Sequence, residues 1–83
     1  MANETIYKDH RRHENSNGTT TEVERKIRRN GDRSEMVYYR DSNESNIVVW
    51  HVVHNAEGRQ LHLHEKFRRA GDSTAWPPEG YRI

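Results

Sequence analysis

Residues 46–69 read NIVVWHVVHNAEGRQLHLHEKFRR, and they hold most of the strong β-formers of the chain and four of its six histidines. The segment 47–54 is rich in β-branched residues and has a length typical of a strand. The segment 59–67 alternates apolar and polar residues, as a half-buried strand does. Between them, the tetrapeptide NAEG at 55–58 has turn chemistry, because Gly58 can adopt a positive φ. These features predict an antiparallel hairpin.

The register of this hairpin decides which side chains share a face. A loop of even length puts the apolar residues of both strands on one face: Val48, Trp50, Val52, Leu61, Leu63 and Phe67. Glu65 follows the same alternation and is expected near the rim of that face. A slip of one residue would move every side chain to the other side, so the even loop is predicted. The second face would then carry Val49, His51, Val53, His62, His64 and Lys66.

Three histidines, His51, His62 and His64, are therefore expected to cluster. His62 and His64 should lie roughly 6.6 Å apart along their strand, and the Cβ atom of His51 roughly 5–8 Å from theirs. Three imidazoles can bind Zn²⁺ or a similar ion and leave one position for a water molecule, which the metal would activate for hydrolysis. No carboxylate is obviously placed on this face to orient a ligand. We favour a polar sheet face of packing or surface histidines and keep a Zn²⁺ site as the alternative.

The same histidines also permit chemistry without a metal. Two imidazoles beside Lys66 could cleave RNA, one accepting the 2′-OH proton and another protonating the leaving oxygen. Nearby basic residues would then stabilise charge on the phosphate. A histidine-based hydrolase, either metal-dependent or ribonuclease-like, is thus one alternative function, with His51, His62 and His64 as its catalytic residues.

Length and composition limit the remaining possibilities. A chain of 83 residues forms one domain at most. Its 14 Lys and Arg residues nearly balance 13 Asp and Glu residues, so the high net charge of a disordered chain is missing. There is no cysteine, which excludes disulfides and thiolate chemistry and suits a cytoplasmic protein. No apolar run reaches transmembrane length, so we expect no membrane association.

The sequence before the hairpin contains an N-terminal end segment and, after it, a segment that is expected to belong to the sheet. Residues 1–18 are expected to form a flexible tail or a charged edge strand. Residues 19–30 fit a short helix, which Thr21 and Glu24 would cap, or a strand that turns at Asn30-Gly31. Val23 and Ile27 would be the only apolar anchors of that helix, so we favour a strand and keep a helix at about 20–30 as the alternative.

The remaining segments complete a sheet and its cover. Residues 34–41, SEMVYYRD, alternate as a strand does, and a polar loop follows them. Residues 70–83 contain two prolines, which exclude a central strand. Trp76 within this tail could fold back over an open face of the sheet, or the tail could be disordered. The prediction is a mainly β protein, a small antiparallel meander of three to five strands with its core at 19–69.

Basic residues are grouped in the sequence and suggest a ligand. Phosphate contacts are predicted for Arg25, Lys26, Arg28, Arg29, Lys66, Arg68 and Arg69. Tyr39 or Trp50 would stack on bases, since a small twisted sheet is a suitable platform for single strands. Acidic residues interleave with these clusters, so an ordinary mixed-charge surface is the competing interpretation.

The sequence thus predicts a small non-enzymatic binding module without a cofactor, and nucleic acid is the first candidate partner. A protein partner is the second, because open sheet edges can pair with another chain or with a second copy in a homodimer. The histidine-based hydrolase is the third.

Overall fold

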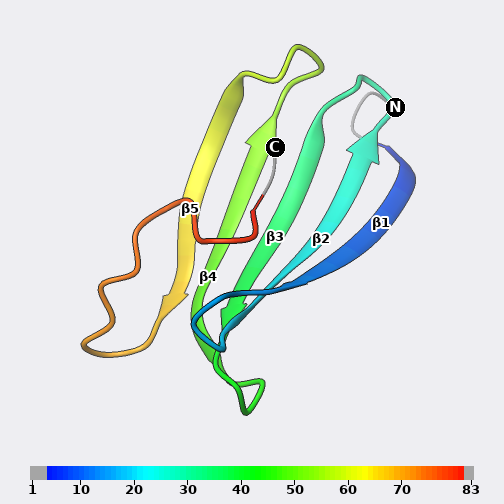
Figure 1. The fold of residues 1–83 in the computed structure, drawn as a ribbon. Helices are drawn as coiled ribbons and strands as arrows, with labels where there is room; N and C mark the ends of the chain where they lie inside the picture. Colours follow the sequence, from blue (N-terminus) through cyan, green and yellow to red (C-terminus); the bar gives the residue numbers. More distant parts are fainter. Residues whose placement is uncertain (1–3, 82–83) are drawn as a thin grey trace.

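The computed structural model describes residues 4–81, which form a single sheet of five strands without a helix. The strands are β1 (Thr5–Glu14), β2 (Thr20–Arg28), β3 (Arg33–Arg40), β4 (Asn46–His54) and β5 (Gln60–Arg68). Each strand pairs antiparallel with its neighbours in sequence, so the sheet order is β1-β2-β3-β4-β5 (Figure 1). The predicted antiparallel meander is therefore confirmed.

The helix considered for residues 20–30 is wrong, because β2 occupies most of that segment. In the sheet, β2 pairs on both sides, with β1 and with β3, which satisfies its backbone hydrogen-bonding groups. Val23 lies directly opposite Val37 and is almost fully buried. A short helix would have buried only Val23 and Ile27, whereas the strand adds its residues to a continuous core.

Most of the segment 1–18 forms the edge strand β1, one of the two structures that the sequence allowed for it. Most of its residues are charged or histidine, although Ile6 and Tyr7 are also exposed, and charged side chains oppose the pairing of an edge strand with further chains. Asn15 turns the chain into β2: its side-chain amide donates to Thr19 Oγ1 at 3.0 Å and to Thr21 Oγ1 at 2.9 Å. Residues 1–3 lie outside the described part of the chain.

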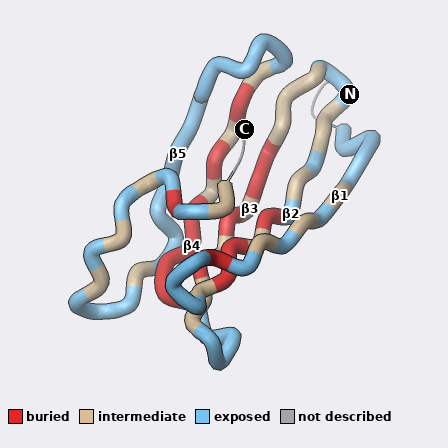
Figure 2. Tube along the Cα trace, viewed as in Figure 1, coloured by how far each residue is buried: buried red, intermediate tan, exposed pale blue. Residues whose placement is uncertain are grey.

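The core lies on one face of the sheet, over its central strands (Figure 2). It contains the buried side chains of Val23, Val37, Tyr39, Ile47, Val48, Trp50 and Val52. A single sheet cannot bury a face by itself, and the C-terminal segment supplies the second layer by crossing this face (Figure 1). We call it the covered face.

Two aromatic residues of the tail make the contact with the core. Trp76 packs against Trp50 edge to face, with ring centroids 5.2 Å apart, and Tyr81 lies 4.7 Å from Trp76. The Tyr81 hydroxyl donates to the buried carboxylate of Glu35 at 2.6 Å. Burial and this hydrogen bond raise the pKa of Tyr81 far above its usual value. The tail therefore also supplies the partner that a buried carboxylate needs.

Polar contacts hold the tail at its far end. The Glu79 carboxylate accepts hydrogen bonds from the backbone N–H and the hydroxyl of Ser16, at 2.9 and 3.0 Å. Gly80 has φ of 88°, and a Cβ atom there would lie 2.7 Å from Asn15 Oδ1. A glycine at this position thus lets the tail approach the β1–β2 turn. The tail follows the covered face as far as the description extends, and residues 82 and 83 of the segment 70–83 lie beyond it.

We expect the change Trp76→Ala to lower the free energy of unfolding by about 2–3 kcal/mol, because it removes the aromatic cover of Trp50. Urea unfolding followed by far-UV circular dichroism measures this loss. Phe67→Ala is the matched control, since Phe67 is 47% exposed on the opposite face, and its loss should be about 1 kcal/mol or less. Equal losses in both variants would contradict a stabilising role for the tail.

Candidate functional site

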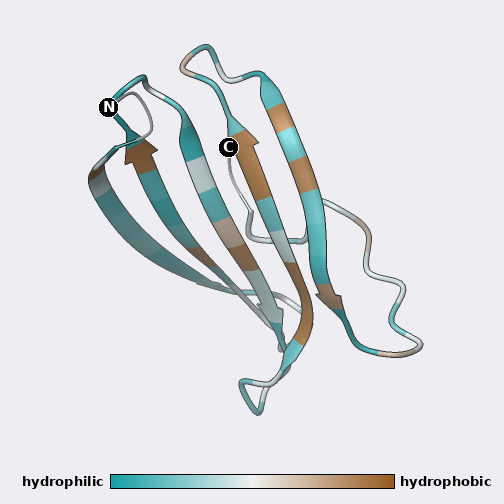
Figure 3. Cartoon of the chain, turned by 180° about the vertical axis from the view of Figure 1, so that it is seen from behind, coloured by the Kyte–Doolittle hydropathy of each residue, from teal (hydrophilic) through white to brown (hydrophobic). Residues whose placement is uncertain are grey.

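The second face of the sheet is not crossed by any segment of residues 4–81, and we call it the open face (Figure 3). Strand pairing arranges its side chains in three rows that run across the strands from β1 to β5. The first row is Arg12, Glu22, Tyr38, Val49 and Phe67; the second is His10, Glu24, Met36, His51 and His64; the third is Lys8, Lys26, Ser34, Val53 and His62. We call the third row the basic row.

The first row is electrically neutralised by its own neighbours. Arg12 donates two hydrogen bonds to the Glu44 carboxylate, at 3.1 and 2.8 Å. Glu22 forms an ion pair with Arg40 and also contacts His10 Nε2 at 2.6 Å. The charges at this end of the open face are therefore satisfied within the protein.

The basic row has no such compensation. Lys8 and Lys26 lie directly opposite each other on β1 and β2, and both are exposed. Neither forms an ion pair with any residue of the described segment 4–81. Like charges in directly opposed positions destabilise a sheet. This pair therefore leaves a positive potential that is available to an anion.

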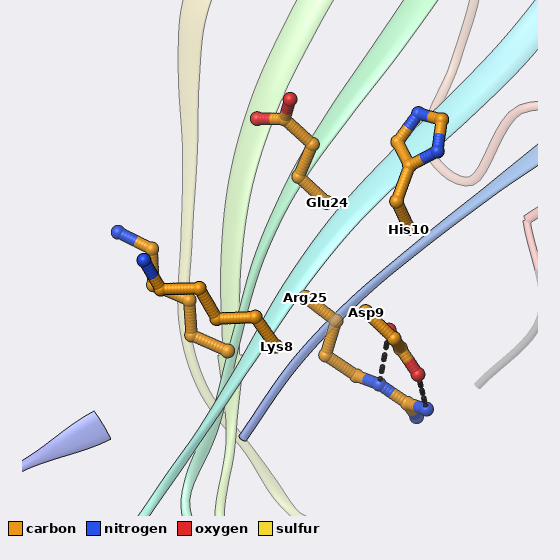
Figure 4. Close-up of a pocket in the computed structure, with 6 residues that line it drawn as sticks. Lys8, Asp9, His10, Glu24 and Arg25 are labelled. Carbon is orange, nitrogen blue, oxygen red and sulfur yellow. Dashed lines mark hydrogen bonds and ion pairs between the residues drawn. The ribbon is translucent and has the colours of Figure 1, made fainter. Parts of the chain in front are cut away.

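A cavity of about 420 Å³ lies beside this pair. Its lining consists of Lys8, Asp9, His10, Glu24, Arg25 and Lys26. Lys8 extends away from the ion pair that Arg25 forms with Asp9 (Figure 4). The Arg25 guanidinium lowers the pKa of Asp9 mainly through their hydrogen bond. The carboxylate of Asp9 is therefore paired with Arg25 and does not neutralise the charge of Lys8.

The three histidines of the hairpin lie together, as predicted from the alternation. The His51 and His62 rings have centroids 5.4 Å apart, and the His62 and His64 rings are stacked with centroids 6.0 Å apart. His51 lies directly opposite His64 in the pairing of β4 with β5. His51 Nε2 and Ser34 Oγ are 2.8 Å apart, at hydrogen-bonding distance. We call His51, His62 and His64 the histidine cluster.

The electrostatic environment of the cluster is positive. Partial burial lowers the pKa of His51, and the positive charges of His62, Lys66, Arg28 and His64 lower it further. Two of these cations, Lys66 and Arg28, come from strands on either side of β4. The neutral imidazole is therefore favoured at His51 for as long as no anion is present to offset these charges.

The geometry of the cluster does not support the Zn²⁺ alternative. Within residues 4–81, no three side chains of His, Cys, Asp or Glu are arranged to hold a metal ion. The His62 and His64 rings lie nearly parallel, at 19° to each other, so they stack face to face and do not converge on a common point. The cluster is instead three neighbouring imidazole groups, each of which can be neutral or protonated.

One prediction for the hairpin is wrong. Leu63 does face Val52, and Glu65 faces Trp50, as expected. Phe67, however, pairs with Val49 and lies on the open face. A β-bulge at Lys66 causes the difference, because an extra residue in one strand reverses the alternation beyond it. Phe67 is consequently an exposed aromatic residue on the same face as the histidines.

The basic residues singled out in the sequence divide into two groups. Four of them are engaged in ion pairs: Arg25 with Asp9, Arg29 with Glu4, Arg68 with Glu65 and Asp72, and Arg69 with Asp41. The other three, Lys26, Arg28 and Lys66, form no ion pair within the described residues. They lie in or beside the basic row and the histidine cluster.

The two aromatic residues expected to stack on bases are not placed to do so. Trp50 is 2% exposed and Tyr39 is 7% exposed, and both belong to the core of the covered face. Tyr38 and Phe67 are the aromatics of the open face instead. The sequence reasoning also missed Lys8, because its position opposite Lys26 depends on the pairing of β1 with β2.

Comparisons with protein families, curated proteins and solved structures find no match to this chain, so its fold and site are argued from its own residues. The described part of the chain contains no helix long and apolar enough to cross a membrane.

The positive neighbours of His51 allow a direct test of the cluster. We expect its imidazole pKa, measured by NMR titration, to lie below the ordinary value of about 6.5. Because the unfolded chain takes up this proton more readily, the contribution of His51 to stability is present above about pH 6.5 and is lost as the pH falls through the lowered value. Lys66→Met should raise the His51 pKa, whereas Lys8→Met, on the far edge of the sheet, should leave it unchanged. A His51 midpoint at or above the ordinary value would contradict this account.

Proposed function

We propose that the protein binds nucleic acid on the open face of its sheet, with the basic row along the phosphate backbone. The observation that carries this proposal is the opposed pair Lys8 and Lys26: both lysines are exposed, and neither forms an ion pair within residues 4–81. A polyanion would convert the repulsion within this pair into attraction and would release the counterions of its own phosphates.

The dimensions of the open face favour a single strand. The basic row crosses four interstrand steps of about 4.8 Å, roughly 19 Å in all. Phe67 and Tyr38 belong to the first row, two rows away, or roughly 13 Å along the strands. A single strand that crosses the face obliquely would contact the lysines with its phosphates and these aromatics with an unstacked base. A regular duplex keeps its bases stacked inside and would use the lysines alone.

The aromatic contacts proposed here replace those first expected at Tyr39 and Trp50. Phe67 offers a freely accessible ring, whereas the Tyr38 ring already lies 4.6 Å from the Arg40 guanidinium. Phe67 is therefore the main stacking residue of the proposal. A cytoplasmic location, which the absence of cysteine favours, would bring this face into contact with RNA.

The basic row predicts a steep dependence of binding on salt. Lys8→Ala and Lys26→Ala should each weaken binding to a single-stranded oligonucleotide and reduce the slope of log K against log salt by about 0.7, the value expected for one lost phosphate contact. Fluorescence anisotropy at several salt concentrations measures both quantities.

Arg12→Ala is the matched control for these lysine variants, because Arg12 lies on the same strand and face but is already paired with Glu44. Its slope should stay close to that of the unaltered protein. If all three variants reduce the slope equally, net charge alone drives binding and the basic row has no special role. If the unaltered protein does not bind single strands at low salt, the proposed function is wrong.

A second candidate partner is another protein chain at the outer edge of β5. Three large apolar side chains of this strand are exposed, Leu61 at 53%, Phe67 at 47% and Leu63 at 37%. The outer backbone groups of β5 face no other strand of the described sheet, so this edge could pair with a second copy of the chain. β-Bulges beside Leu61 and Lys66 limit regular pairing to the four residues between them.

Sedimentation velocity over a range of protein concentrations tests this edge. If two copies pair through β5, the unaltered protein should dimerise and Leu63→Lys should remain monomeric, because a charge on an edge strand opposes pairing. The same change made at Ile6 on the other edge strand, Ile6→Lys, is the control and should leave the dimer intact. A monomer at every concentration would exclude self-pairing at this edge.

A further inference from the structure

The histidine cluster concentrates basic groups around one point of the open face, whereas the lysines of the basic row, Lys8 and Lys26, lie at the β1–β2 end of that face. His51 is in electrostatic contact with four other basic side chains: His62, Lys66, Arg28 and His64. β5 contributes two histidines and a lysine, β2 contributes an arginine, and β3 contributes the hydroxyl of Ser34. These groups come from three strands and lie around His51, which is on β4.

A cavity of about 250 Å³ adjoins His51, which is the member of the histidine cluster that lines it. It is lined by Glu24, Lys26, Arg28, Ser34, Met36 and His51. The Nε atom of Arg28 is buried and has no hydrogen-bond partner among the described residues. A buried donor without an acceptor is rare in folded proteins, and it is often explained by a bound group. The cavity therefore combines an unsatisfied donor with a hydroxyl and an imidazole.

One carboxylate, that of Glu24, also lines the cavity, and it has a partner. The Tyr38 hydroxyl donates to Glu24 at 3.2 Å. Lys26 and Arg28 are the other charged side chains of this lining, both from β2, and Lys26 is exposed. With Arg28 and the groups of β5 included, the basic residues around His51 outnumber this single acid. The site is therefore suited to an anion that carries more than one charge.

We propose that the histidine cluster, with Arg28, Lys66 and Ser34, binds a phosphomonoester dianion, such as the terminal phosphate of a nucleic-acid strand. An internal phosphodiester carries one charge and matches the single charges of Lys8 and Lys26 in the basic row. A phosphomonoester carries about −1.5 to −2 at pH 7 on one phosphorus, and it matches a point where several basic groups meet. Charge-assisted hydrogen bonds from imidazolium, guanidinium and ammonium groups are the strong ones available to phosphate.

This inference rests on the proposed function for the source of the phosphate: the basic row would hold the strand, and the cluster would hold its end. The same chemistry would accept a free phosphate ion or a small phosphorylated metabolite. Binding would be coupled to protonation, because the dianion favours the charged form of the histidines. The groups that face His51 are Glu24, Lys26 and Arg28 from β2 and His62, His64 and Lys66 from β5, whereas β3 presents the uncharged Ser34 and Met36.

The pH dependence distinguishes an end-binding site from general attraction. The dianion forms above its second pKa of about 6, and an imidazolium group ordinarily loses its proton above about 6.5. Affinity for a terminal phosphate should therefore pass through a maximum between about pH 6 and pH 7. Affinity for a strand without a terminal phosphate should only decline as the pH rises.

The experiment uses the full chain and oligonucleotides of one sequence with a 5′-phosphate, a 3′-phosphate or neither, together with inorganic phosphate as the free ion. Fluorescence anisotropy measures affinity, and NMR of the histidine rings reports their pKa values. We expect a terminal phosphate to increase affinity about tenfold near pH 6.5, the effect of one good charge-assisted hydrogen bond. It should also raise the His51 pKa more than the unphosphorylated strand does.

The variant His64→Gln should weaken this preference and keep the binding of unphosphorylated strands, because His64 is exposed and lies outside the basic row, so it can be changed without disturbing the core or the lysines. His10→Gln, on the same face but separated from β4 by the two strands β2 and β3, is the matched control and should retain the preference.

Each outcome has a separate meaning. If strands bind equally with and without a terminal phosphate, the end-binding site is wrong and the proposed function stands. If inorganic phosphate raises the His51 pKa but no oligonucleotide binds, the phosphate site stands and nucleic acid is not its source. If neither strands nor phosphate alter the histidines, both proposals are wrong.

Discussion

The stacking of Trp76 on Trp50 is the contact on which the rest of this structure depends. A five-stranded open sheet has two faces, and a chain of 83 residues has too few apolar side chains to cover both. The tail covers one of them with Trp76 and Tyr81 and supplies the hydroxyl that the buried carboxylate of Glu35 requires. Because this cover uses the only long segment outside the strands in residues 4–81, the other face of the described sheet stays in contact with solvent.

That asymmetry explains the distribution of charge. On the covered face, ionic groups are buried or half-buried and therefore need partners, as the contact of Asp9 with Arg25 shows. On the open face, water solvates ionic groups, so a pair such as Lys8 and Lys26 costs far less there than it would in the core. Solvation lowers the energetic cost of this pair, but it does not explain why two lysines occupy directly opposed positions on neighbouring strands. A polyanionic ligand would give it a physical reason.

The two proposals concern different parts of one surface. The lysines of the basic row, Lys8 and Lys26, present positive charges that do not change near neutral pH, and they would contribute affinity that depends on salt but little on pH. The histidine cluster presents charges that appear only on protonation, and it would add dependence on pH and on the chemical nature of the phosphate. The histidines are thus interpreted as anion-binding groups, because their rings stack and do not converge on a metal.

Local patterns in the residues were sufficient for the meander, the central hairpin and the association of His51, His62 and His64, because alternation and turn chemistry act over a few neighbouring residues. The partners of individual charges were not predictable in this way. Lys8 meets Lys26, and Arg68 meets Asp72, through strand pairing and a turn whose register no short segment specifies. The bulge at Lys66, which carries Phe67 to the open face, and the fold-back of Trp76, which buries Trp50, likewise arise only when the whole sheet is assembled. Tertiary structure therefore decided which residues of the candidate site are accessible, since accessibility depends on what covers a face and not on the residues that form it.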